Sequence, residues 1–214
     1  MSDRASPILL ATSDLGDTRH VCAFFRSDDE EYDVLLPFIK QGLDQGEKAI
    51  HVVDEDRRED HLRRLEAAGI DTAAATARRQ FELRGSVDTY LQQGRFDQDR
   101  MLARFEQWAD DGVAGPFPRS RIICRMDWAS EGGSLVNDVI EFESRVNDLW
   151  RRYDDVVVCT YRLDRIRGDD VIDMMRTHPV VIIGSLLQRN PFYVPPERFI
   201  QVLRARRTEN AATA

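Results

Sequence analysis

The chain has 214 residues, of which 42% are hydrophobic and 32% charged, and 30 Lys and Arg against 38 Asp and Glu give a formal charge of −8. This composition is ordinary for one globular domain that needs no disulfide or metal for stability. The acidic excess argues against a nucleic-acid-binding domain, because phosphate contacts require clustered Lys and Arg. No apolar run reaches the roughly eighteen residues of a membrane span, and the N-terminus lacks the order of a secretory signal, so we expect a cytoplasmic protein.

Short apolar, β-branched runs recur along the chain and predict strands that are buried on both faces, as in a parallel sheet. These runs are His20–Phe25, Ala49–Val53, Phe81–Leu83, Arg121–Met126, Val156–Tyr161 and Val180–Leu187. Helical patterns separate most of them, over about 28–45, 56–68, 98–109, 135–150 and 169–175. Strands that alternate with helices predict a three-layer α/β fold, with a mainly parallel central sheet and helices on both faces.

The ends of the predicted helices carry recognisable signals. Ser27 and Glu30 have the spacing of a capping box at the start of the first helix, and Pro37 should kink that helix because it removes a backbone hydrogen bond. Gly69 is the expected glycine after the second helix, and Asp97 precedes the third. We find no repeat and no linker, which predicts one domain.

The first strand-to-helix turn is where a nucleotide-binding α/β protein places its glycine-rich loop. The stretch Phe24–Tyr32 reads F-F-R-S-D-D-E-E-Y, which has no glycine and no lysine and four consecutive acids. Such a turn has no cradle for a phosphate and repels one electrostatically, so a working P-loop ATPase is not expected. Gly132-Gly133-Ser134 also joins a strand to a helix, and we interpret it as a turn and helix cap in preference to an anion-binding nest.

The three cysteines, Cys22, Cys124 and Cys159, all lie in apolar runs, which predicts reduced, buried core residues. His20 and Cys22 share a strand face and, with Cys159 or His51, would offer soft metal ligands. However, the chain has no C-x-x-C or H-x-x-x-H spacing. We therefore expect no metal, no other cofactor and no catalytic thiol.

Two further patterns admit two interpretations each. Glu143, Asn147 and Trp150 share one helix face, which favours either a polar contact in a pocket or an ordinary helix edge. Asn190-Pro191-Phe192-Tyr193 forms a rigid turn that presents two aromatic rings, which either cover an apolar pocket or cap the sheet.

Several stretches, taken in order and register, resemble one known family. They are His20–Phe25, Gly42–Asp56, Arg125–Ala129, Glu141–Leu149, Cys159–Arg165 and His178–Pro196. In these the chain looks like the MEDS domain, the methanogen/methylotroph, DcmR sensory domain, over residues 18–197. Residues 198–214 would then be a helix end and a frayed tail.

The resemblance implies a RecA/KaiC-like fold without working Walker motifs, in a bacterial sensory protein of signal transduction. Members of the family are proposed to bind small hydrocarbon derivatives. Such a domain would bind a small apolar or weakly polar ligand and act through a separate partner, such as a kinase, an anti-sigma-type protein or a transcription regulator, or through a homodimer.

The positions carried over from the family are His20, Met126, Trp128, Glu143, Asn147, Cys159, Tyr161, His178, Asn190, Pro191, Phe192 and Tyr193. From these we predict a ligand site made of Trp128, Glu143, Tyr161, His178, Asn147, Phe192 and Tyr193. We place it at the carboxyl ends of the central strands, where open α/β sheets bind ligands. Arg125 departs from the family, in which an acidic residue is common there, so the ligand should differ if that acid contacts it.

The sequence therefore predicts a small-molecule sensor or signalling adaptor without catalysis. The alternative is a degenerate RecA-type nucleotide-binding protein or phosphohydrolase that uses Asp127 with Asp54 and Glu55. A third hypothesis is an interaction module that binds no ligand.

Overall fold

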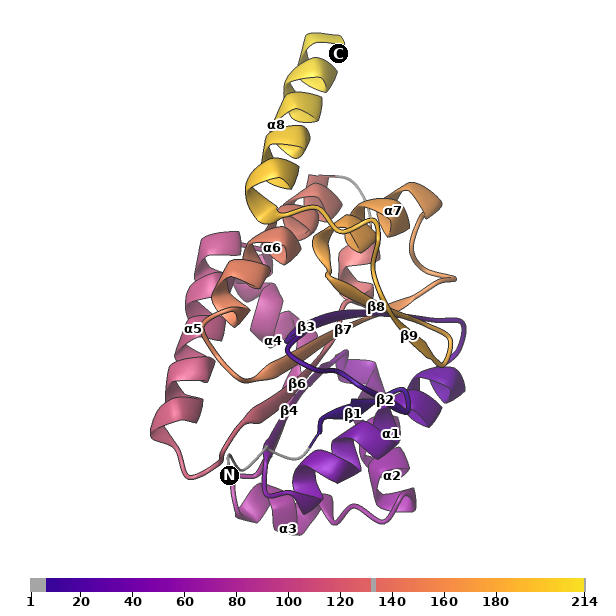
Figure 1. Cartoon of the computed structure of the whole chain (residues 1–214), viewed down its shortest axis with the longest axis vertical. Coiled ribbons are helices and arrows are strands. Elements are labelled where there is room, and N and C mark those ends of the chain that lie inside the picture. The colour runs from indigo at the N-terminus through magenta and orange to yellow at the C-terminus, as the bar shows by residue number, and fades with distance from the viewer. Residues whose placement is uncertain (1–6, 132–133, 214) are drawn as a thin grey trace.

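The computed structural model describes residues 7–131 and 134–213 and is built on one seven-stranded sheet in the order β5-β4-β6-β7-β3-β8-β9 (Figure 1). Its strands are β3 (His20–Phe25), β4 (Lys48–Val53), β5 (Phe81–Gly85), β6 (Ser120–Arg125), β7 (Val156–Arg162), β8 (Val180–Ile183) and β9 (Leu186–Arg189). All neighbouring strands are parallel except β8 and β9. The predicted α/β fold with a mainly parallel sheet is confirmed.

The last apolar run differs from its prediction. The sequence indicated one strand over Val180–Leu187, but the chain reverses after Ile183 and pairs β9 antiparallel to β8. Gly184, with φ of +62°, occupies the left-handed region that glycine adopts without a Cβ clash. The turn is hidden in the sequence because the residues on both sides of it are apolar.

The helices are α1 (Asp28–Asp44), α2 (Arg58–Ala67), α3 (Thr72–Ala77), α4 (Ser86–Tyr90), α5 (Gln98–Ala114), α6 (Ser134–Trp150), α7 (Gly168–Thr177) and α8 (Pro196–Thr213). Short 3-10 turns cover Glu55–Arg57, Gln92–Gly94 and Asp127–Glu131, and a small hairpin pairs β1 (Leu9–Leu10) with β2 (Ser13–Asp14). The sequence did not predict α3, α4 or the hairpin. Helix α8 continues to Thr213, into the stretch that was expected to fray.

The predicted helix caps mostly form. The Ser27 side chain accepts a hydrogen bond from the Glu30 backbone N–H, and Glu30 in turn accepts from the backbone N–H of Arg26. Asp97 caps α5 by accepting from the Arg100 backbone N–H. Gly69 follows α2 with φ of +81°, the left-handed conformation expected after a helix end. The pair Gly132-Gly133 lies outside the described residues.

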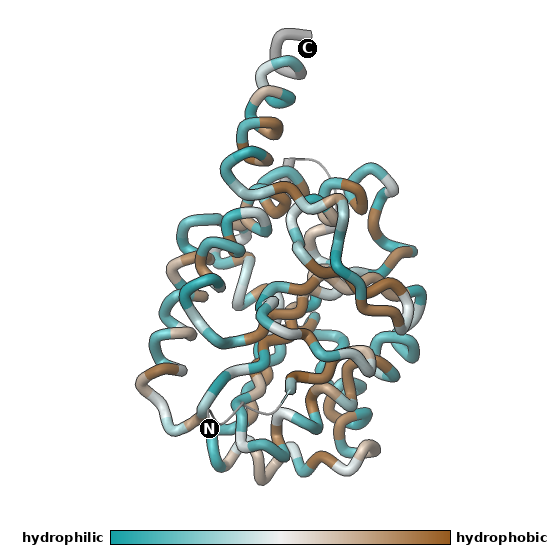
Figure 2. The backbone as a smooth tube through the Cα atoms, viewed as in Figure 1, coloured by the Kyte–Doolittle hydropathy of each residue, from teal (hydrophilic) through white to brown (hydrophobic). Residues whose placement is uncertain are grey.

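Two hydrophobic cores lie on opposite faces of the sheet, which makes the molecule three-layered. One core packs α4, α5, α6, α7 and α8 against the sheet, and the other packs α1, α2, α3 and β1 against its opposite face. Figure 2 shows the central strands as the most hydrophobic part of the chain, while the helices alternate between apolar and polar turns. Polar side chains buried next to either core therefore need a specific explanation.

Candidate functional site

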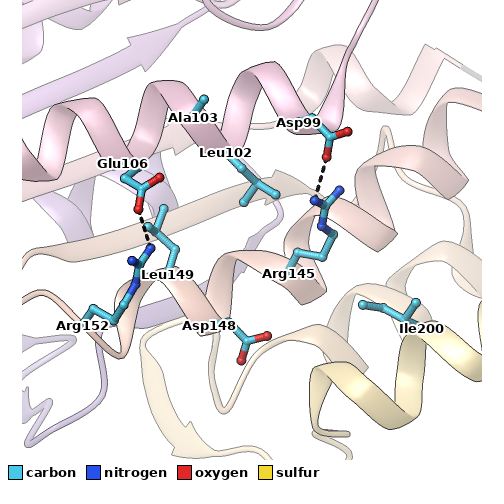
Figure 3. A pocket seen from close by; sticks show the side chains of 9 residues that line it. All are labelled: Asp99, Leu102, Ala103, Glu106, Arg145, Asp148, Leu149, Arg152 and Ile200. Carbon is cyan, nitrogen blue, oxygen red and sulfur yellow. Dashed lines mark hydrogen bonds and ion pairs between the residues drawn. The ribbon is translucent and has the colours of Figure 1, made fainter.

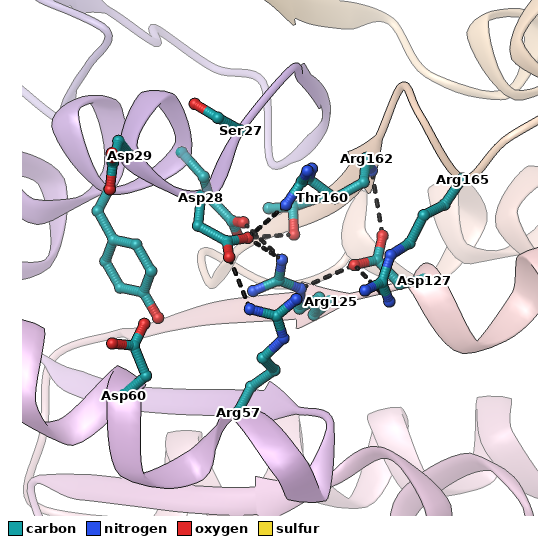
Figure 4. A network of polar contacts seen from close by, with 12 residues as sticks. Ser27, Asp28, Asp29, Arg57, Asp60, Arg125, Asp127, Thr160, Arg162 and Arg165 are labelled. Atoms are coloured by element: carbon teal, nitrogen blue, oxygen red, sulfur yellow. Dashed lines mark hydrogen bonds and ion pairs between the residues drawn. The ribbon is translucent and has the colours of Figure 1, made fainter.

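A network of ion pairs fills the carboxyl ends of β3, β6 and β7, next to the start of α1 (Figure 4). Arg125 lies at its centre, with distances of 2.5 Å to Asp28, 2.9 Å to Asp127 and 3.4 Å to Glu31. Arg162 also reaches Asp28, at 2.7 Å. These side chains occupy the position where a P-loop protein would cradle phosphate.

The network is close to electrically balanced, with Arg57, Arg125 and Arg162 facing Asp28, Glu31 and Asp127. Burial raises the pKa of Asp28, but the hydrogen bond and charge of Arg125, aided by Arg57 and Arg162, outweigh it and lower that pKa to about 2. The third arginine, Arg57, pairs with Asp28 at 2.7 Å. The arginines are thus committed to partners of this chain.

A second polar cluster lies under α6, inside the core on the other face of the sheet. Its central residue is Glu143 of α6, which is 0% exposed. One carboxylate oxygen, Oε2, lies 3.1 Å from Nε2 of His20 and 3.4 Å from Nε2 of His178. The same oxygen lies 3.5 Å from Sγ of Cys159, and Oε1 accepts a hydrogen bond from the Tyr161 hydroxyl at 3.3 Å.

The hydrogen bonds around the two imidazoles fix their orientation. The amide of Asn147 donates to backbone carbonyls of Glu143, Ser144 and Thr177, so its Oδ1 is the atom that faces Nδ1 of His20, at 3.2 Å. Nδ1 of His178 faces the carbonyl oxygen of Met174 at 3.0 Å. Both Nδ1 atoms are therefore donors, and in the neutral rings both Nε2 atoms carry lone pairs directed toward Glu143.

Burial and mutual contact shift the ionisation of this cluster. Burial raises the pKa of Glu143, but His178 and His20 together outweigh it and hold it at about 2. Burial, and then His178, lowers the pKa of His20. Burial and the Glu143 charge raise the pKa of the Cys159 thiol well above its usual value. The two shifts oppose each other, because the pKa of Glu143 is low only while the imidazoles donate protons to it, whereas burial disfavours a second proton on His20.

The structure brings together several of the predicted site residues and leaves others apart. Tyr161 and His178 each contact Glu143, and Asn147 donates hydrogen bonds to the backbone carbonyls of Glu143 and Thr177. Trp128 lies on the same face of the sheet but in an aromatic group, where it stacks on Tyr90 with ring centroids 4.6 Å apart. The two aromatic residues of the turn Asn190–Tyr193 differ in exposure, because Phe192 is 61% exposed whereas Tyr193 is half-buried.

The predicted position of the site is only partly right. Tyr161 lies near the carboxyl end of β7, but His178 precedes β8 and His20 is the first residue of β3. The imidazoles therefore lie at the amino ends of their strands, so the placement at carboxyl ends is wrong for His178. The sequence already indicated this position, because His178 stands before the predicted strand Val180–Leu187 and not after it.

A small pocket of about 230 Å³ opens at the amino ends of these strands. It is lined by His20, Asn147, Trp150, Arg151, Pro179, Tyr193 and the loop residues Asp17, Thr18 and Arg19 before β3. Because His20 and Asn147 also contact the Glu143 cluster, the pocket connects the surface to the buried polar group. His20 and Cys159, which the predicted site did not include, belong to the buried Glu143 cluster.

A comparison with known families identifies the family of the chain. Residues 19–179 match the family model described as MEDS, the MEthanogen/methylotroph, DcmR Sensory domain. The chain belongs to the MEDS family. No curated protein matches the chain significantly. The match spans both polar groups of this MEDS domain, from His20 of β3 to His178 before β8.

A larger surface groove of the MEDS domain, about 560 Å³, runs between α5 and α6 (Figure 3). Two ion pairs bridge it, Arg145 with Asp99 at 2.6 Å and Arg152 with Glu106 at 2.7 Å. Its polar groups are largely exposed and already paired, so the groove is an ordinary helix contact. Within the described residues, no helix is long and apolar enough to span a membrane.

Proposed function

We propose that this MEDS domain binds a small, weakly polar molecule in the pocket at the amino ends of β3 and β8, which we call the amino-edge pocket. We further propose that the bound molecule changes the contacts of the buried Glu143 cluster. The observation that carries the proposal is a fully buried carboxylate, that of Glu143, whose contact residues His20 and Asn147 line a pocket. Burying a charge without a nearby counter-charge costs several kcal/mol, so such groups gather at functional sites. The volume of about 230 Å³ suits a ligand of only a few heavy atoms.

We further propose that the domain does not catalyse a reaction. The thiolate is the nucleophilic form of cysteine, and the raised pKa of Cys159 keeps its thiol protonated. The carboxylate of Glu143 is already engaged by its neighbours. A binding role needs only that the ligand alters these contacts.

The ion-pair network at the carboxyl ends of β3, β6 and β7, which we call the carboxyl edge, does not favour the nucleotide-binding alternative. A phosphate there would have to compete with Asp28, Glu31 and Asp127 for the arginines that they hold. The helix N-terminus beside it carries four acids in its first turn, Asp28, Asp29, Glu30 and Glu31. Both features oppose the binding of an anion.

We propose that the signal leaves through α8 to a separate partner protein. Tyr193 lines the pocket, and only two residues separate it from Pro196, where α8 begins. Figure 1 shows α8 projecting beyond the body of the molecule. A ligand that displaces Tyr193 would therefore shift the base of this helix.

A thermal-shift screen of the full chain against small alcohols, amides, halogenated hydrocarbons and nucleotides tests the proposal. A ligand that binds only the folded state raises the melting temperature, and the shift grows with the logarithm of its concentration above the dissociation constant. We expect a small weakly polar compound, and no nucleotide, to stabilise the protein. Tyr193→Ala should abolish the shift, whereas Phe192→Ala, which removes the exposed neighbouring ring, should retain it.

Two results would contradict the proposal. The first is stabilisation by a nucleotide that disappears on Asp127→Ala, which would move the site to the carboxyl edge. The second is a small-molecule shift that survives Tyr193→Ala but is lost in Phe192→Ala.

A further inference from the structure

Four potential metal ligands converge in the Glu143 cluster, one from each of four separate parts of the fold. Nε2 of His20 and of His178, Oε2 of Glu143 and Sγ of Cys159 all lie within 4.8 Å of one another. The measured separations include 3.1, 3.4, 3.5 and 3.6 Å. Donor atoms around a tetrahedral zinc ion, with bonds of about 2.0–2.3 Å, are about 3.3–3.7 Å apart, so these four of the six separations are close to the edges of a coordination tetrahedron.

The lone pairs of the two Nε2 atoms and of the Glu143 carboxylate point toward one another, an arrangement that a cation between them would stabilise. Both histidines donate from Nδ1, so when the rings are neutral their Nε2 lone pairs face a carboxylate oxygen that carries lone pairs of its own. Within the described part of the chain, Nε2 of His178 has no hydrogen-bond partner, although it is 0% exposed. A buried nitrogen that points at a carboxylate and makes no hydrogen bond needs an explanation.

We propose that His20, Glu143, Cys159 and His178 bind a divalent transition-metal ion, with zinc the best match. Two imidazoles, a carboxylate and a thiolate are ligands that zinc accepts in protein sites. On binding, the Cys159 thiol releases its proton to solvent and forms a sulfur–metal bond. The two anionic ligands then neutralise the dication, which leaves no net charge in the core.

The surroundings supply the support that metal-bound histidines need. Asn147 holds Nδ1 of His20, and the Met174 carbonyl with the Thr177 hydroxyl holds Nδ1 of His178. Such outer contacts fix the tautomer and the ring direction of a ligating histidine. His20 also lines the amino-edge pocket, which gives an ion a path to the site.

Four protein ligands leave no open position for a substrate, so the ion would hold α6, β3, β7 and the start of β8 together. This differs from the expectation based on the sequence, which rested on the absence of close ligand spacing. The four ligands lie far apart along the chain, and only the order of the strands brings them together. The inference does not depend on the sensor proposal, since the pocket can bind a molecule whether or not a metal lies beneath it.

The test uses the full chain after dialysis against a chelator. Addition of Co²⁺ should give one equivalent of tetrahedral cobalt, with intense visible bands and a thiolate-to-cobalt charge-transfer band in the near ultraviolet. Zn²⁺ should displace the cobalt with the same stoichiometry. Cys159→Ser should remove the charge-transfer band, whereas Cys124→Ser, the matched change at the neighbouring strand position, should keep it.

A positioning variant gives a second measurement should Cys159→Ser fold poorly. Asn147→Ala removes the support of His20 but no ligand, and should weaken Zn²⁺ binding about 10–100-fold in competition with a chromophoric chelator. The proposal fails if the wild-type protein binds less than half an equivalent of either ion, or if the cobalt spectrum lacks the charge-transfer band. Unchanged zinc affinity in Asn147→Ala would exclude His20 from the site. Repeating the small-molecule screen on chelated protein tests the sensor proposal separately.

Discussion

All four histidines of the chain are buried, and they form two pairs that have different surroundings. His20 and His178 face a carboxylate, with ring centroids 4.0 Å apart. His51 and His61 instead form a neutral chain, in which Nδ1 of His51 lies 2.9 Å from Nε2 of His61 and Nδ1 of His61 lies 2.6 Å from the Tyr32 hydroxyl. The same residue type thus serves a charged site and a hydrogen-bonded core.

The second pair should make the protein sensitive to mild acid. Burial, with Arg125 adding to it, lowers the pKa of His61 to about 4. Between pH 6.5 and 4 the unfolded chain therefore binds a proton that the folded chain refuses, and stability falls as the pH falls through this window. From His61 alone the loss at pH 5 is about 2 kcal/mol relative to pH 7.

Urea unfolding of the wild type and of His61→Gln at pH 7 and pH 5 measures this effect. Glutamine keeps a donor and an acceptor for Tyr32 and His51 but does not titrate, so the variant should lose less stability between the two pH values. Equal losses in both proteins would show that another group controls the acid response.

Arg125 is a second residue whose environment predicts a large effect. It is 3% exposed and pairs with Asp28, Glu31 and Asp127. Removal of the charge by Arg125→Met leaves these carboxylates facing one another in a partly buried place. We expect a destabilisation of about 3–5 kcal/mol, because breaking a buried ion pair on one side leaves an uncompensated charge.

Arg152→Met provides the matched control, because this arginine pairs with Glu106 while both side chains are well exposed. Exposed pairs contribute about 0–1 kcal/mol, so this change should have little effect on the denaturant midpoint. If Arg125→Met and Arg152→Met lower the free energy of unfolding by similar amounts, the buried ion pairs of Arg125 contribute no more to stability than an exposed pair.

At the scale of elements, the sequence predicted the strands well, because each central strand is a short apolar run with polar turns around it. It predicted α1, α2, α5, α6 and α7 from caps and from apolar positions on one helix face. It missed α3 and α4, which are only a turn or two long, and it joined β8 to β9 because leucines and isoleucines flank Gly184 on both sides. Short elements leave too few residues for a period to appear.

The interior of α1 contains a glycine that the sequence alone does not explain. A Cβ at Gly42 would lie 2.6 Å from both Cδ and Nε of Arg121, which is 1% exposed. Arg121 is held in place by Glu47 at 2.5 Å and by the Phe38 carbonyl at 2.6 Å. The absence of a side chain therefore admits a buried guanidinium between α1 and β6.

Gly42→Ala should be destabilising, although alanine is the better helix former by about 1 kcal/mol. Displacement of the buried arginine should cost about 1–3 kcal/mol, as overpacked cores do. Gly168→Ala at the start of α7, where a Cβ meets nothing within 4 Å, should change stability by less than about 0.5 kcal/mol. A neutral Gly42→Ala would mean that Arg121 moves aside freely.

At the scale of the whole molecule, the sequence identified much of the candidate site but not its assembly. Glu143 and Asn147 were found because they share a helix face, and Tyr161 and His178 because they flank strands. The convergence of His20 with Cys159 depends on β3 lying beside β7, an order that local patterns do not encode. Trp128 packs against Tyr90 in the core, and a sequence pattern does not distinguish this position from one in a pocket, so its role in binding stays a prediction.

The three cysteines lie side by side across the middle of the sheet, since Cys159 of β7 is in register with Cys22 of β3 and Cys124 of β6. Each is at most 2% exposed, so an alkylating reagent can reach none of them until the central strands separate. Their labelling rates should therefore coincide and report global opening of the protein, in the manner of slow amide exchange. If a metal binds Cys159, zinc should slow the labelling of all three cysteines by the same factor, because an ion held only by the folded protein makes the global opening rarer.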